Sequence, residues 1–197
     1  MTEFARISSG YAIWHTYDPK IKAELFSTAL VAGNELTIID PIALPPAHQT
    51  ELESLGRVAR IVITNANHAR NAATFAHSYA APIFAPPELG AELPHGYSLH
   101  DALALGPLRV IRIEGAAEGE FALYHPDDGG TVIIGDALIN FDPHGFTLLP
   151  RKYCGNQKQM TRSLRKLLDF DFARIFFAHG NPIMIRARER LESLLNS

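Results

Sequence analysis

The stretch IVITNANHAR, residues 61–70, joins an apolar, β-branched run to a cluster of polar side chains. The run from Val58 to Thr64 is typical of a buried β-strand. Polar residues that directly follow such a strand stand at the carboxyl end of a sheet, where α/β proteins usually bind their ligands. The side chains predicted to bind a ligand here are Asn65, Asn67, His68 and Arg70.

Two later strands are predicted to end in the same way. The run 132–135 leads to Asp136, and the run 173–178 leads to His179 and Gly180. Because neighbouring strand ends project side chains into a common space, we expect these residues to share one pocket with the cluster after Thr64. Asp136 and His179 are therefore candidate site residues. A structural role stays open for both, since an Asp after a strand is often a helix N-cap and a His often a hydrogen-bonding core residue.

The rest of the chain predicts short strands followed by strand–helix units, and this order occurs twice. The predicted strands cover residues 4–8, 11–16, 25–31, 36–39, 82–85, 108–113, 121–124 and 131–134. The predicted helices cover residues 47–55, 71–79, 157–168 and 185–195, and a Pro- and Gly-rich loop covers 86–100. Turn signals stand at Gly33-Asn34 and at residues 127–130. We therefore expect an α/β fold, a four-layer αββα sandwich, in one domain spanning residues 1–197.

Composition and charge limit the partners. The chain has 197 residues, of which 47% are hydrophobic, and 18 Lys+Arg against 21 Asp+Glu give a net charge of -3. This balance argues against a nucleic-acid partner, and no apolar run is long enough to span a membrane. The single Cys154 excludes an internal disulfide. With no signal-like start, we expect a cytoplasmic protein that binds a small molecule, and we leave a homo-oligomer open.

The chain resembles the metallo-β-lactamase superfamily over nearly its whole length. The segments that carry the resemblance are LTIIDP (36–41), IVIT (61–64), EGAAEGEFALY (114–124), IIGDA (133–137) and FFAHG (176–180). The resemblance implies the αββα sandwich of that family and a relation to metal-dependent hydrolases. It does not decide whether this chain is an enzyme.

Most of the metal ligands that the family pattern implies are replaced. The positions of three family histidines and one aspartate in the first motif, and of one histidine in the second, hold Asn65, Asn67, Arg70, Ala69 and Ala116. Asp136 and His179 remain, and the resemblance makes them the predicted catalytic pair. Amides and alanine are poor or impossible zinc ligands, so we expect the dinuclear site to be lost and no metal to be a regular cofactor. If His68 turns inward, then His68, Asp136 and His179 could hold a single zinc, iron or manganese ion, at well under one equivalent.

Arg70 offers a replacement for the missing charge. A buried Asp136 needs a positive partner, and we predict a hydrogen bond between the Arg70 guanidinium and this carboxylate. Glu114 and Glu118 are expected to extend the network, with Glu118 among the ligand-binding residues. An internal salt-bridge network without a ligand is the structural alternative.

Three functions remain open. The leading hypothesis is a metal-free or weakly metallated protein that binds a small polar or anionic ligand. The first alternative is a hydrolase with a mononuclear site, and the second is a non-catalytic scaffold that binds another protein. Metal content separates the first two, and an exposed apolar patch would favour the third.

Overall fold

Seven strands form the first sheet, in the same spatial order as in the chain. They are β1 (Glu3–Arg6), β2 (Tyr11–Asp18), β3 (Ala23–Ala32), β4 (Glu35–Ile39), β5 (Arg57–Val62), β6 (Ile83–Ala85) and β7 (Leu99–Asp101). Strands β1 to β4 pair in antiparallel fashion, and β4 to β7 pair in parallel. The predicted turn at Gly33-Asn34 joins β3 to β4. Helices α1 (Pro46–Glu53) and α2 (Ala72–Tyr79) connect parallel strands, as the strand–helix pattern predicts.

The second sheet has four strands, in the order β13-β10-β9-β8. They are β8 (Arg109–Arg112), β9 (Phe121–His125), β10 (Thr131–Ile134) and β13 (Arg174–Phe177). The predicted turn over residues 127–130 joins β9 to β10, and β10 runs parallel to β13. A separate hairpin of β11 (Leu138–Phe141) and β12 (Gly145–Leu148) follows Asp136, and the sequence does not predict it.

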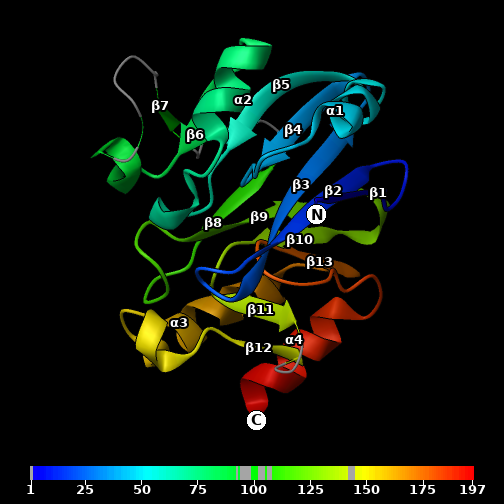
Figure 1. Cartoon of the computed structure of the whole chain (residues 1–197). Helices are drawn as coiled ribbons and strands as arrows, with labels where there is room; N and C mark the ends of the chain where they lie inside the picture. The colour runs from blue at the N-terminus through cyan, green and yellow to red at the C-terminus, as the bar shows by residue number, and fades with distance from the viewer. Residues whose placement is uncertain (1, 92, 94–98, 102–104, 106–107, 142–144) are drawn as a thin grey trace.

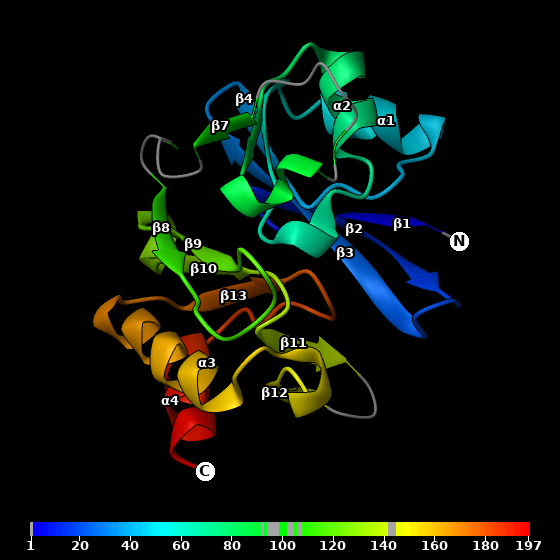
Figure 2. The ribbon, with the colours of Figure 1, turned by 90° about the vertical axis from the view of Figure 1, so that its left-hand side faces the viewer.

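The computed structural model describes residues 2–91, 93, 99–101, 105, 108–141 and 145–197. Figures 1 and 2 show the two sheets face to face, with α1 and α2 outside the first sheet and α3 (Gln157–Leu164) and α4 (Ala187–Asn196) outside the second. The predicted four-layer αββα arrangement is therefore confirmed. None of the helices in these residues is both long and apolar enough to cross a membrane.

Alternating side chains along the strands build the core on both faces of each sheet. In β2, Ala12 and Trp14 pack in the cluster under α1 and α2, whereas Tyr11 and Ile13 pack in the cluster between the sheets. A third cluster lies between the second sheet and α3 and α4. This period of two is what a strand buried on both faces requires.

Several predicted boundaries differ from the structure. The helix predicted over 157–168 ends at Leu164 and continues as a 3₁₀ helix over Arg165–Asp169, whose period of three keeps Leu164 and Leu167 on the buried side. The last helix begins at Ala187, because Arg186 has a φ of 54° and breaks the helical path. The loop predicted over 86–100 contains a 3₁₀ helix at Pro87–Ala91 and the start of β7, and its residues 92 and 94–98 lie outside the described residues.

Strand ends from both sheets meet at one rim. The backbone N–H of Ala178, after β13, donates to the carbonyl of Ile134 at the end of β10 (3.0 Å). The N–H of Phe26 in β3 donates in turn to the carbonyl of Ala178 (2.9 Å). The first bond lies within the second sheet, and the second bond ties this sheet to the first one near Asp136 and His179.

Candidate metal and ligand site

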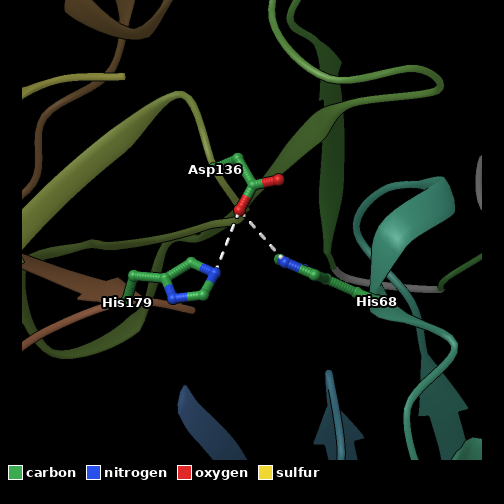
Figure 3. A group of neighbouring side chains, drawn as sticks. All are labelled: His68, Asp136 and His179. Atoms are coloured by element: carbon green, nitrogen blue, oxygen red, sulfur yellow. Dashed lines mark hydrogen bonds and ion pairs between the residues drawn. The ribbon is translucent and has the colours of Figure 1, made fainter. Parts of the chain in front are cut away.

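Three side chains from three segments converge at this rim. His68 ends a 3₁₀ turn (Ala66–His68) after β5, whereas Asp136 and His179 each lie two residues beyond parallel strand ends. Figure 3 shows both imidazoles pointing toward the same carboxylate oxygen, His179 from the left and His68 from the right. Nε2 of His68 and Nε2 of His179 each lie 3.1 Å from Oδ1 of Asp136. The structure thus brings together the two predicted catalytic residues and the inward-turned His68.

The outer nitrogen of each imidazole, the Nδ1 that points away from Asp136, lies next to an oxygen atom. Nδ1 of His68 lies 2.9 Å from Oδ2 of Asp40, a fully buried carboxylate at the end of β4. Nδ1 of His179 donates to the backbone carbonyl of Glu24 in β3 (3.0 Å). Histidines that ligate metals usually donate their other N–H to a carboxylate or carbonyl in this way.

Arg70 lies beside the cluster, but its partners differ from the prediction. Its Nη1 donates to the backbone carbonyls of Phe26 (2.9 Å) and Asp40 (3.2 Å), and its Nη2 approaches Nε2 of His179 at 3.4 Å. The predicted hydrogen bond to Asp136 is wrong: no such bond is present in the described part of the chain. The two imidazoles contact Asp136 instead, because the carbonyls of Phe26, within β3, and of Asp40, just after β4, hold the guanidinium to one side.

Asn65 and Asn67 have different surroundings. Asn65 is fully buried, its Oδ1 accepts from the N–H of Asn67 (2.9 Å), and its Nδ2 donates to Oε2 of Glu120 (2.6 Å). The side chain of Asn67 is exposed. Asn65 therefore connects the turn before His68 to a buried carboxyl, and within the described residues neither amide group is hydrogen-bonded to the three converging side chains.

Glu120 holds the position that we predicted for Glu118. Its Oε1 accepts from the N–H of Ala137 (3.0 Å), beside Asp136, whereas the side chain of Glu118 is exposed. Glu114 is also exposed and pairs with Lys166 (3.7 Å). Sequence spacing could not separate Glu118 from Glu120, because both precede β9 and lie two residues apart.

Close packing of the backbone supports the site. A Cβ on Gly135 would lie 2.6 Å from Oγ1 of Thr64 and 2.9 Å from Oε1 of Glu120, so the end of β10 can press against these groups only as glycine. Asp40 and Arg70 have φ values of 49° and 36°, in the left-handed region that non-glycine residues rarely adopt. Such backbone strain is typical of functional sites.

The charges around His68 shift several pKa values. Burial and Arg70 oppose protonation of His68, but Asp40 and Asp136 outweigh them and raise its pKa to about 9. Burial lowers the pKa of His179, and the charge of Arg70 adds to this effect. Burial would raise the pKa of Asp136, yet His68 and His179 hold it well below its usual value. Burial and the charge of Asp136 raise the pKa of Glu120 to about 8.

The three converging donors fit one metal ion. One ligand atom from each of His68, Asp136 and His179 lies within 4.8 Å of the others, a group of three that could hold an ion among the residues described. Nδ1 of His179 carries the proton that it donates to Glu24, so neutral His179 presents a lone pair to Oδ1 of Asp136 at 3.1 Å. Two acceptors in contact repel each other, and a cation between them would remove this repulsion. The donor set is also that of mononuclear zinc sites, which use three protein ligands and leave one position open.

A sequence profile described as the metallo-beta-lactamase superfamily matches residues 7–197. The chain belongs to the metallo-β-lactamase superfamily. The crystal structure of a metallo-β-lactamase from Erythrobacter litoralis matches with a TM-score of 0.75 and 19% identity, covering 99% of this chain and 96% of that one. A metallo-β-lactamase from Pontibacter korlensis matches with a TM-score of 0.75 and 16% identity over 100% of both chains. At these identities the likeness to solved superfamily members concerns the fold. No curated protein matches the chain.

Sequence reasoning missed two carboxyl groups of the site, Asp40 and Glu120. Asp40 had a usable signal, because it follows an apolar strand just as Asp136 and His179 do. Thr64, which bonds to Asp40, lies at the end of the strand that the sequence predicts. Only Glu120 lacked a distinguishing signal.

Proposed function

We propose that this member of the superfamily is a metal-dependent hydrolase that uses one divalent ion where the family pattern provides for two. The observation that carries the proposal is the convergence of His68, Asp136 and His179, with each outer imidazole nitrogen facing an oxygen and each inner nitrogen facing the carboxylate. Loss of the dinuclear site is part of this proposal. It is supported by Asn65 and Asn67, whose amide groups form no hydrogen bond with any of the three in the part of the chain that the structure describes.

An ion held by these three side chains would supply Lewis acidity and an acidified water for attack on the substrate. The chain's own residues would do the rest. Asp40 and the carbonyl of Glu24 orient the imidazoles. Arg70, held by two carbonyls, places a positive charge next to His179, where it would stabilise negative charge that develops on a substrate oxygen.

The test is zinc binding by metal-stripped protein. As purified, the protein should hold less than one equivalent of metal, because the positive charge of Arg70 repels a metal ion bound next to it. On titration, binding should saturate at one equivalent and raise the melting temperature, since zinc would bind only the folded state. His179→Ala should abolish this binding, whereas His77→Ala, at an exposed histidine of α2, should leave it unchanged. Failure to saturate, or saturation at two equivalents, would contradict the proposal.

A second candidate is the metal-free binding of a small anion, and it is favoured by the 3.4 Å approach of Arg70 to His179. With His68 protonated, two positive groups, His68 and Arg70, balance the two carboxylates Asp40 and Asp136 without an ion. In this case zinc should not saturate, and inorganic phosphate should raise the melting temperature of the native protein but not of Arg70→Gln. The scaffold hypothesis stays untested.

A further inference from the structure

We propose that Asp40 is a positioning residue that keeps the proton of neutral His68 on Nδ1, so that Nε2 faces Asp136 and His179 with a free lone pair. This inference deepens the proposed function and rests on it for its purpose, because an imidazole can bind a metal only through a nitrogen without a proton. His68 stands at a spacer position of the family motif, so the family pattern assigns it no such partner.

The atoms around Nδ1 of His68 are all acceptors. Thr64 has a single hydroxyl proton, and Oγ1 donates it to Oδ2 of Asp40 at 2.6 Å. Oγ1 of Thr64 therefore turns a lone pair toward Nδ1 of His68 at 3.0 Å, and Oδ2 of Asp40 offers another at 2.9 Å. Only an N–H on Nδ1 satisfies this arrangement.

Asp136 competes for the same proton from the other side of the ring. Its Oδ1 lies farther from His68, at 3.1 Å, and its side chain is 13% exposed, whereas that of Asp40 is 3% exposed. A carboxylate with less access to water gains more from a hydrogen bond. In the neutral imidazole, Asp40 therefore retains the proton.

The carboxylate of Asp40 cannot easily turn away. Its Oδ1 accepts from the backbone N–H of Thr64 (2.8 Å), and its own N–H donates to the carbonyl of Val62 (2.9 Å). Its carbonyl accepts from the hydroxyl of Ser27 (2.8 Å) and from Arg70. Asp40 thus orients His68 through its side chain and Arg70 through its backbone, and so links a metal ligand to the neighbouring positive charge.

Asp40→Asn tests the proton position with little change of shape. The N–H of Thr64 should keep the amide oxygen at the Oδ1 position, so that the amide NH₂ points at His68 and donates to Nδ1. The proton of neutral His68 must then move to Nε2, the nitrogen that would ligate, as happens when the orienting aspartate of a catalytic triad becomes asparagine.

The readout is ¹⁵N NMR of the imidazole in metal-free protein, recorded in the high-pH range in which the ¹⁵N shifts of the His68 ring no longer change with pH. Wild-type protein should show a protonated Nδ1 and a bare Nε2, and Asp40→Asn the reverse. Thr64→Val is the matched control, because it removes a buried hydrogen bond to Asp40 but leaves the contact between Asp40 and His68. It should retain the wild-type proton position. Zinc affinity should fall about 10- to 100-fold in Asp40→Asn.

Each outcome has a clear meaning. A wild-type spectrum with the proton on Nε2 would overturn the inference, and this measurement decides even if Asp40→Asn does not fold. An Asp40→Asn spectrum like that of wild type would also overturn it. If the proton lies on Nδ1 in a protein that binds no zinc, the proposed function fails and the positioning role of Asp40 stands.

Discussion

Nη2 of Arg70 lies 3.4 Å from Nε2 of His179, the nitrogen that also faces Asp136. The guanidinium cannot move far from this position, because Nη1 is bonded to the carbonyls of Phe26 and Asp40. A fixed positive charge therefore stands next to a group of three metal-type donors. The two candidate functions give this contact different roles: Arg70 would oppose the metal ion in the hydrolase, and it would help to bind the anion in the metal-free protein.

Replacing Arg70 with Gln should raise the affinity for zinc at least tenfold. Repulsion between a guanidinium and a divalent ion about 4 Å away is on the order of several kcal/mol at an effective dielectric of about 20. Competition with a chelator of known affinity measures the change, with Arg70→Lys as a control that keeps the charge. Equal affinity in wild type and Arg70→Gln would show that the charge does not oppose the ion.

Substitutions that exchange the amide of Asn65 and the carboxyl group of Glu120 should have strongly coupled effects on the unfolding free energy. In Glu120→Gln, one amide group cannot accept from both Ala137 and Asn65, so a buried donor loses its partner at a cost of about 1–3 kcal/mol. Asn65→Asp alone brings two carboxyl groups together. The double variant restores every bond, because the carboxylate introduced at position 65 would accept from the new amide and from the N–H of Asn67.

Urea unfolding of the two single variants and the double variant measures this coupling. We expect the double variant to be more stable than the sum of the single effects by more than about 1 kcal/mol. Additive effects would mean that the bond between Asn65 and Glu120 contributes little.

The raised pKa of Glu120 predicts a pH effect on stability. Its pKa is about 8 in the folded chain, against an ordinary value of 4.5, so between these pH values the folded state retains a proton that the unfolded state has lost. The stability that Glu120 contributes should therefore be present below pH 4.5 and decline as the pH rises to about 8. The difference in unfolding free energy between wild type and Glu120→Gln, measured from pH 5 to 9, should follow this decline. A pH-independent difference would indicate an ordinary pKa for Glu120.

Gly135→Ala should destabilise the fold by about 1–3 kcal/mol, the usual cost of overpacking a tight core. The added Cβ would meet Thr64, Asn65 and Glu120 at 2.6–2.9 Å. Gly10→Ala is the control, since nothing lies within 4 Å of a Cβ at that position. Thermal or urea unfolding compares the two, and similar stabilities would show that the end of β10 can move aside.

The sequence alone determined the layers of the fold and the rim where the site lies. Apolar runs of strand length, turn residues at Gly33-Asn34 and at residues 127–130, and amphipathic helices are local patterns, so they can be read without tertiary contacts. Polar residues directly after strands identified His68, Asp136 and His179, because the carboxyl ends of adjacent strands meet at one edge. The β11–β12 hairpin was missed.

Only the tertiary structure decided which polar groups meet. Arg70 was predicted to bond to Asp136, but the carbonyls of Phe26 in β3 and of Asp40 after β4 hold it elsewhere, and His68 contacts Asp136 instead. Asp40 lies 28 residues before His68 in the chain, and Glu120 lies 55 residues after Asn65. Contacts between such distant residues depend on strand register and on how the sheets pack. No spacing within a single segment encodes these contacts. Composition and motifs therefore predict where the site lies, but they do not predict its hydrogen bonds.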